Sequence, residues 1–169
     1  MAILRLSGII GQTIVDGPGL RLAVYTQGCP HACPGCHNPE SHDFNGGFDK
    51  HISEIFEMFL KNPLLTGITF SGGEPFAQAQ PLAVLAELVR QRGKTVFCFT
   101  GYTFEELLRI SREDKGVRNL LPNIDVLVDG RYVQEEKDLS LRFRGSRNQR
   151  VLDLPKSLAL AEAVVAEGY

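Results

Sequence analysis

The chain has 169 residues, of which 43% are hydrophobic and 22% are charged, and its formal net charge is −2. This is ordinary globular composition, and the length fits a single domain over residues 1–169. The charge gives no support for a nucleic-acid-binding surface, and no apolar run approaches the ~20 residues of a membrane-spanning helix, so we expect neither nucleic acid nor membrane as a partner.

The predicted elements alternate between strands and helices along the chain. Strands are expected at Ile3–Ile10, Leu20–Gln27, Gly67–Phe70, Thr95–Thr100 and Ile124–Asp129, and helices at Phe48–Asn62, Pro81–Gly93, Thr103–Glu113 and Leu154–Gly168. Short apolar strands that alternate with amphipathic helices predict βαβ units, an α/β fold and a parallel sheet. The chain is too short for an eight-stranded barrel of ~250 residues, so we predict a partial, open parallel (β/α) barrel.

Ligands of parallel α/β folds bind at the carboxyl ends of the strands. Here four of the predicted strands end in polar or glycine-rich loops, which contain the cysteines, "SGGEP", "TGY" and "DGRY". We therefore expect these four loops to lie at one edge of the sheet and to form the functional site.

Three of the four cysteines, Cys29, Cys33 and Cys36, lie in one loop over residues 26–41. The N-terminus has no signal-peptide pattern, which predicts a cytoplasmic protein whose thiols stay reduced and are free to bind metal. The spacing C-x3-C-x2-C allows one loop to surround a small inorganic centre, and thiolates are ligands of iron–sulfur clusters and of zinc. Three cysteines leave one iron of a four-iron cluster open to a ligand from outside the protein.

Two other interpretations of the cysteine loop stay open at this point. A zinc site with three cysteines needs a fourth ligand, which His31 or His37 would supply. A disulfide with one free thiol is the other possibility. The fourth cysteine, Cys98, lies within an apolar strand, where we expect a buried small hydrophobic residue.

The segment Gly72-Gly73-Glu74 follows a predicted strand and precedes a helix. Two glycines allow the backbone to approach a ligand closely, and strand-end amides there can bind a carboxylate. Backbone carbonyls and Glu74 can accept hydrogen bonds from an ammonium group. Because this segment and the cysteine loop are expected at the same edge, the pair indicates a cofactor site.

With these two motifs the sequence resembles the radical S-adenosylmethionine (SAM) enzymes. The segments "VDGPGLR", "QGCPHACPGCHNPES" and "SGGEP" are similar to the activases of glycyl-radical enzymes. The segments "FTGYTFEEL", "IDVLVDGRYVQEEKD" and "FRGSRNQRVLD" are most similar to the activating branch for anaerobic, class III ribonucleotide reductases. These segments cover most of the chain.

The resemblance implies that Cys29, Cys33 and Cys36 each bind one iron of a [4Fe–4S] cluster, and that the fourth iron binds the amino and carboxylate groups of SAM. It implies reductive cleavage of SAM and removal of a hydrogen atom from a backbone glycine of the partner reductase subunit. The electron donor expected for the family is a reduced protein such as flavodoxin. The cofactor supplies the difficult chemistry, and the protein orients and shields it.

The residues that the resemblance assigns to SAM are Gly35, Cys36, His37, Gly72, Gly73 and Glu74. The last three would line the methionine end, and the first three would run beside the nucleoside. The broad superfamily has an aromatic residue where this chain has Gly35, whereas the reductase-activating branch also has glycine. The residue that stacks on adenine is therefore open, with His37 and Tyr102 as candidates.

Asp129 ends an apolar strand at the expected site. It is placed to contact the ribose or a bound cation, and the equal alternative is that it caps the loop before Gly130. The segment 140–169 contains an arginine-rich run, which is a solvated basic surface or a part of the chain that completes the site or the partner surface.

Three classes of function compete on this evidence. The first is activation of an anaerobic ribonucleotide reductase, or of another glycyl-radical enzyme such as pyruvate formate-lyase. The second is a small-molecule radical SAM enzyme of the deazapurine synthase type. The third is a non-catalytic zinc module. The short chain leaves few residues for a lid, which favours an open site and a protein substrate.

Overall fold

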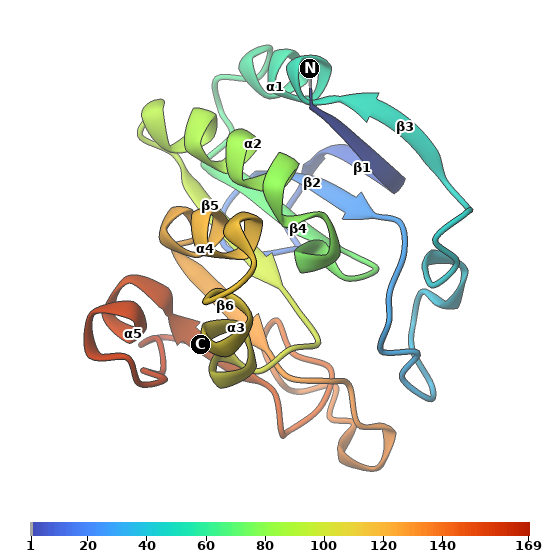
Figure 1. Ribbon diagram of the computed structural model, residues 1–169, viewed down its shortest axis with the longest axis vertical. Helices are drawn as coiled ribbons and strands as arrows, with labels where there is room; N and C mark the ends of the chain where they lie inside the picture. The colour runs from blue at the N-terminus through green and yellow to red at the C-terminus, as the bar shows by residue number, and fades with distance from the viewer. Residues whose placement is uncertain (1) are drawn as a thin grey trace.

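The computed structural model describes residues 2–169, and in it seven strands form one sheet in the order β3-β1-β2-β4-β5-β6-β7 (Figure 1). The strands are β1 (Ile3–Thr13), β2 (Arg21–Thr26), β3 (Phe48–His51), β4 (Gly67–Gly72), β5 (Thr95–Phe99), β6 (Val126–Asp129) and β7 (Arg150–Asp153). The helices are α1 (Ile52–Leu60), α2 (Ala79–Gln91), α3 (Phe104–Ile110), α4 (Lys115–Leu120) and α5 (Leu154–Leu160). Single 3-10 turns lie at η1 (Pro39–Ser41), η2 (Pro75–Gln78), η3 (Leu121–Asn123) and η4 (Gln134–Glu136).

The four central strands, β2, β4, β5 and β6, are parallel, which confirms the predicted parallel sheet for the middle of the molecule. The outer strands differ from the prediction, because β1, β3 and β7 each run antiparallel to their neighbours. The sheet is open, because β3 and β7 are its two edge strands. It is also mixed, because it contains both parallel and antiparallel pairs. A connection without a crossover helix joins β1 to β2 and β6 to β7, and such connections lead to antiparallel pairing.

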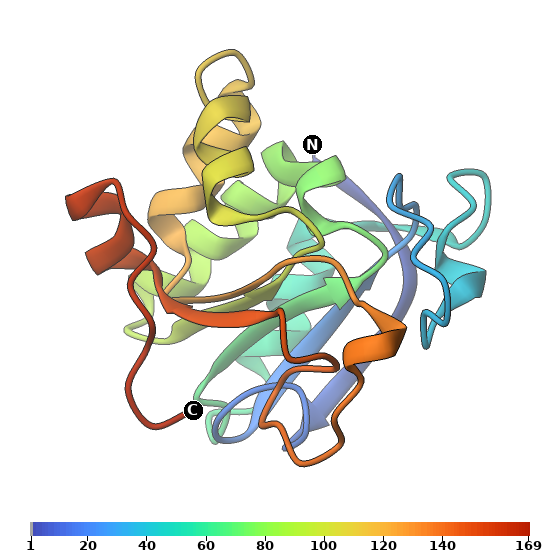
Figure 2. The ribbon, with the colours of Figure 1, turned by 90° about the horizontal axis from the view of Figure 1, so that it is seen from below.

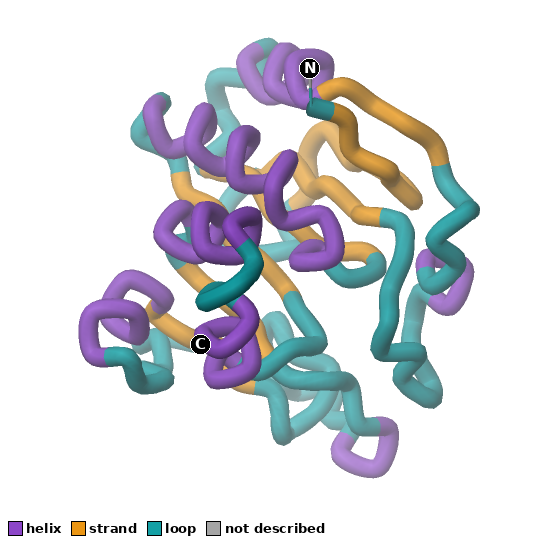
Figure 3. The backbone as a smooth tube through the Cα atoms, viewed as in Figure 1, coloured by secondary structure: helices purple, strands orange, loops and turns teal. Residues whose placement is uncertain are grey.

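The two faces of the sheet are covered differently. Helices lie over one face, and the tube view shows them gathered on that side, while loops and the C-terminal end of the chain lie across the other face (Figures 2 and 3). In β5 the alternation of side chains separates the two sides. Val96 and Cys98 belong to the large core beneath the helices, and Phe97 belongs to a smaller cluster with Val128 and Val151 on the opposite face.

Three predicted helices are shorter than expected, and the helix predicted at Thr103–Glu113 covers only Phe104–Ile110. The helix predicted at Phe48–Asn62 begins at Ile52, because residues 48–51 form the edge strand β3. His51 caps the helix in a reciprocal capping box with Glu54, which marks the point where the strand ends. The helix predicted to reach Gly168 ends at Leu160, where Ala161 adopts a left-handed conformation with a φ of 52°.

The strand β7 and the short helix α4 were not predicted. Both are short, and β7 is an edge strand whose pattern is not distinct from that of a loop. The capping box predicted at Thr103 and Glu106 is confirmed at the start of α3. No helix within residues 2–169 is long and apolar enough to cross a membrane.

Arg21 is the largest charged residue buried within the described part of the chain, with 1% of its surface exposed. It lies at the start of β2 and donates hydrogen bonds to Thr69, Thr95, Pro18 and Ile68. Burial lowers the pKa of the guanidinium from its usual value to about 10. The side chain therefore joins the starts of β2, β4 and β5, at the end of the sheet opposite the cysteine loop.

We expect Arg21→Lys to destabilise the protein, because a lysine has three donors and cannot reproduce the planar fork of the guanidinium. Buried carbonyl groups left without partners predict a loss of about 2–4 kcal/mol in the free energy of unfolding, or a Tm lower by roughly 4–16 °C. Thermal unfolding of the metal-free protein measures this change. The exposed Arg109 on α3 provides the matched control, Arg109→Lys, and equal Tm values for the two variants would contradict the assigned role.

Candidate functional site: a three-cysteine cleft

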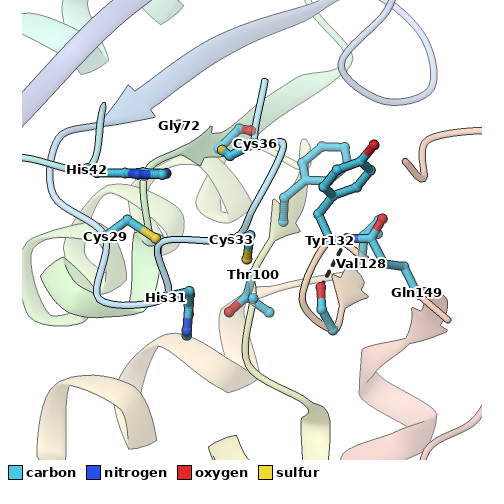
Figure 4. Close-up of a pocket in the computed structure, with 15 residues that line it drawn as sticks. Cys29, His31, Cys33, Cys36, His42, Gly72, Thr100, Val128, Tyr132 and Gln149 are labelled. Carbon is cyan, nitrogen blue, oxygen red and sulfur yellow. Dashed lines mark hydrogen bonds between the residues drawn. The ribbon is translucent and has the colours of Figure 1, made fainter. Parts of the chain in front are cut away.

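A cleft lies where β2, β4, β5 and β6 end (Figure 4). Its walls come from the cysteine loop, from the ends of β4, β5 and β6, and from the loop before β7. The lining residues are Cys29, His31, Cys33, Cys36, His42, Ser71, Gly72, Gly73, Phe99, Thr100, Gly101, Val128, Gly130, Tyr132 and Gln149. The four loops expected at one edge of the sheet therefore meet there.

The three loop cysteines are half-buried free thiols, and each lines the cleft. Partial burial raises the pKa of the Cys29 thiol, and the nearby Glu74 carboxylate adds to this effect, while hydrogen bonds from the backbone of His31 and Ala32 oppose it. A metal ion would have to displace the proton. Asp, Glu, Lys and Arg are all missing from the residues that line the cleft, so its strongest candidate metal ligands are cysteine sulfur and histidine imidazole groups.

Among residues 2–169, no group of three His, Cys, Asp or Glu side chains is close enough together to hold a single metal ion. A four-iron cluster makes a different demand, because each cysteine binds a different iron at a corner of the cube. Three thiols spread around one cleft fit that demand. Cys98 is fully buried in the core, and burial raises the pKa of its thiol, as expected for a small hydrophobic residue.

The glycine segment packs against the start of the cysteine loop. The amide of Gly73 donates to the carbonyl of Thr26 at 2.7 Å, and the amide of Glu74 donates to the carbonyl of Gly28 at 2.9 Å. A Cβ atom on Gly73 would collide with that Gly28 carbonyl, and Gly72 has a φ of 95°. These amides, which we expected to bind a ligand, are therefore engaged within the protein, and the glycines allow two backbones to approach closely.

Glu74 is fully buried, and its side chain does not belong to the cleft lining. One carboxylate oxygen accepts from the amide of Phe76 and the hydroxyl of Thr100, at 3.0 and 2.8 Å. The other accepts from the amide of Gly101 at 2.8 Å and lies 2.7 Å from Nε2 of His31. The carboxylate thus joins the cysteine loop to the loop after β5, and its contact with SAM stays a prediction.

Asp129 is also buried and does not line the cleft. It accepts hydrogen bonds from the amide of Phe104 at the start of α3 and from the guanidinium of Arg150 on β7. Arg150 also pairs with Glu105. These contacts join β6 to α3 and β7, and they are not the cap of the loop before Gly130 that we named as the alternative. A contact with ribose or a cation stays a prediction.

Gly35 and His37 lie toward the tip of the cysteine loop. Gly35 has a φ of 75°, and a Cβ atom there would meet the side chain of Gln134, so the loop packs closely against η4. His37 is exposed and its ring centroid lies 5.2 Å from that of Tyr132. His37, Cys36 and Tyr132 line a second hollow, which shares six residues with the cleft: Cys36, Ser71, Gly72, Phe99, Tyr132 and Gln149.

The structure adds Tyr132 and Gln149 to the candidate site. Both line the cleft and the adjoining hollow, and both come from the segment between β6 and β7. Tyr132 stands in the "DGRY" loop that the strand pattern placed at this edge, but an isolated tyrosine carries no distinctive signal. Gln149 accepts from the amides of Gly145 and Ser146 and donates to the carbonyl of Gly130, so it also sets the shape of this segment.

The other candidate for adenine stacking, Tyr102, packs edge-on against the ring of His31 at 4.5 Å between centroids. The arginine-rich run has several local roles. Arg142 lies over the rings of Phe143 and Tyr169, and Arg150 holds Asp129. Within segment 140–169, it is therefore Gln149, rather than an arginine, that lines the cleft.

Comparison with known proteins identifies the family to which this chain belongs. Residues 15–152 match the family model described as a 4Fe-4S single cluster domain. The chain is 37% identical over 144 residues to an anaerobic ribonucleoside-triphosphate reductase-activating protein of Haemophilus influenzae, covering 80% of this chain and 89% of that protein. The chain belongs to the family of anaerobic ribonucleoside-triphosphate reductase-activating proteins.

Proteins with the same name from Escherichia coli (strain K12) and Enterobacteria phage T4 are 36% and 30% identical over 149 and 145 residues. The alignments cover 82% and 81% of this chain, and 91% and 86% of those proteins. Membership of the reductase-activating family, which the sequence motifs predicted, is thus confirmed. The three thiols of the cleft fall within the residues matched by the 4Fe-4S domain.

Proposed function

We propose that the chain is an enzyme that activates an anaerobic ribonucleoside-triphosphate reductase by radical SAM chemistry. The observation that carries the proposal is the set of three free thiols around one cleft in a member of the reductase-activating family. The thiolates of Cys29, Cys33 and Cys36 would hold three irons of a [4Fe–4S] cluster. When bound, such a reduced cluster would supply the one electron that cleaves a C–S bond of SAM into methionine and a 5′-deoxyadenosyl radical, which would take a hydrogen atom from a glycine of the reductase.

The residues of the chain would orient SAM and exclude water. Gly72 and Gly73 present backbone without side chains at the end of β4, where the methionine end of SAM would lie beside the cysteines. The rings of His37 and Tyr132 both line the adjoining hollow and would offer stacking surfaces for the nucleoside. Phe99 lines both spaces and contributes apolar surface to them.

The reductase subunit is the proposed protein partner, and a one-electron donor such as reduced flavodoxin would serve the cluster in the cytoplasm. A glycine of the partner has to come within contact of bound SAM. The lining of the cleft comes from the cysteine loop, from the ends of the central strands and from the segment 130–149. In the view of Figure 1 the cysteine loop and this segment lie at the lower end of the molecule, and no helix of residues 2–169 is drawn over them. This position favours a macromolecular substrate.

The proposal is tested by anaerobic reconstitution with iron and sulfide, reduction, and electron paramagnetic resonance (EPR) with and without SAM. We expect the signal of a reduced four-iron cluster that changes when SAM is added. Addition of the anaerobic reductase should then produce a glycyl-radical signal, whereas pyruvate formate-lyase should give none. Binding of zinc without iron, or a cluster signal that SAM does not affect, would contradict the proposed activity.

We expect Cys98→Ala to leave cluster content and SAM cleavage unchanged, because this thiol is buried in β5 beneath the helices. Removal of one buried sulfur predicts a loss of about 1 kcal/mol in the free energy of unfolding. Iron and sulfide analysis of the reconstituted variant measures the first effect, and thermal unfolding measures the second. Loss of the cluster in this variant would show that the ligands are not the three loop cysteines.

A further inference from the structure

One side chain from within the cysteine loop, that of His31, connects the loop to the glycine segment after β4. At its ends the loop is closed by backbone hydrogen bonds from Gly28 to Ser41 and from Cys29 to His42. Between the cysteines, His31 places Nε2 at 2.7 Å from the carboxylate of Glu74. Only 5% of the His31 side chain and none of the Glu74 side chain is exposed, so this contact is shielded from water.

His31 and Glu74 each make further contacts besides the one between them. Glu74 receives three other hydrogen bonds, from Phe76, Thr100 and Gly101, which leave little freedom for the carboxylate. The ring of His31 packs against Tyr102, and a Cβ atom on Gly101 would collide with that ring. The histidine is thus fitted between the ends of β4 and β5, and it cannot shift without breaking contacts on two loops.

The ring of His31 extends away from the sulfur atoms of Cys29 and Cys36 (Figure 4). His31 lines the cleft, but its Nε2 is engaged by the Glu74 carboxylate in the metal-free chain. Because His31 lies two residues from both Cys29 and Cys33, this contact restrains the part of the loop that carries these two cysteines.

We propose that His31 and Glu74 form a positioning brace, which sets the arrangement of the three thiols before a cluster binds. The proposal rests on the proposed function for the identity of the cluster, but the brace itself is a property of the metal-free chain. The physical reason is preorganisation: a loop that is already ordered loses less conformational entropy when it binds its cluster.

The test compares His31→Phe, His31→Gln and Glu74→Gln with the wild-type protein. Phenylalanine keeps the ring and its packing on Tyr102 but cannot bond to the carboxylate. Glutamine at position 31 places an amide donor near the position of Nε2. Glutamine at position 74 replaces one acceptor oxygen by a donor that faces donors. Glu40→Gln, at an exposed position in the same loop, is the matched control.

Hydrogen exchange of the reduced, metal-free protein measures order in residues 28–42. We expect exchange there to be at least about tenfold faster in His31→Phe and Glu74→Gln, with rates in β5 and α2 unchanged. Glu40→Gln should match the wild type, and His31→Gln should recover most of the protection. If Glu74→Gln does not fold, His31→Phe still decides, because its substitution lies in the loop and not in the core.

Reconstitution then gives the second readout. We expect His31→Phe to retain less iron and to show a broadened cluster EPR signal, and His31→Gln to restore both. Unchanged exchange in His31→Phe, or equal defects in His31→Phe and His31→Gln, would overturn the brace. Failure of the wild-type protein to bind a cluster would refute the proposed function alone, since exchange in the metal-free chain is measured independently.

Discussion

Cys33→Ala is expected to abolish cluster binding and SAM cleavage while the fold is kept. Cys33 is the middle thiol of the loop and lines the cleft together with the other two. Removal of a group that hydrogen-bonds to a metal ligand typically lowers metal affinity by about 10–100-fold. Removal of a ligand itself should therefore lower the affinity for the cluster by at least about 100-fold. The residue is half-buried in a loop outside the two hydrophobic clusters, and the metal-free Tm should change by less than about 2 °C.

The measurements are iron and sulfide per chain after anaerobic desalting, and methionine released from SAM. Cys98→Ala is the control, because it removes a thiol of the same chain from a position outside the cleft. Full SAM cleavage by Cys33→Ala would contradict the assignment of the ligands. A fall in Tm as large as that expected for Arg21→Lys would mean that the loop supports the fold as well as the site.

Gly73→Ala is expected to impair both the stability of the protein and cluster binding, through backbone geometry and not through loss of a ligand. The added Cβ would collide with the carbonyl of Gly28 and lie 3.0 Å from the carbonyl of Ser41, and neither backbone atom moves easily. The same shift would also strain the hydrogen bond from the amide of Gly73 to the carbonyl of Thr26. We expect a loss of about 2–3 kcal/mol in the free energy of unfolding, with a Tm lower by roughly 4–12 °C.

Because the collision lies at the base of the cysteine loop, Gly73→Ala should also lose most of its iron. Thermal unfolding and iron analysis of the same preparation separate the two effects. Gly11→Ala in β1 is the control, since a Cβ there would meet no atom within 4 Å and the residue has no positive φ. A Gly73→Ala protein as stable as Gly11→Ala would show that β4 and the cysteine loop can separate without cost.

Much of the site followed from local patterns. The spacing of Cys29, Cys33 and Cys36 is a property of the sequence itself. The pattern of apolar residues at 95–99 predicted that Cys98 is buried in the core, as it is in the structure. The order of the central strands put the cysteine loop and the glycine segment at one edge, because parallel strands end on the same side. The capping box at Thr103 was equally local.

The outer parts of the fold were beyond such patterns. The four residues of β3 were predicted as the start of a helix. Their extended conformation depends on pairing with Ile3–Leu6 of β1, which is distant in the sequence. The strand β7 is defined by its antiparallel partner β6 in the same way. Edge strands of this length have too little periodicity of their own to be distinguished.

The protein contacts of the buried carboxylates depend on tertiary structure. The oxygens of Glu74, whose contact with SAM stays a prediction, meet His31, Thr100 and Gly101, which are distant in the sequence. Asp129 likewise meets Arg150 and the start of α3. Residue type and spacing therefore indicated a thiolate metal site in the cysteine loop. Which polar groups support that loop depends on distant segments that meet only in the folded protein, because a buried carboxylate needs more donors than its own segment provides.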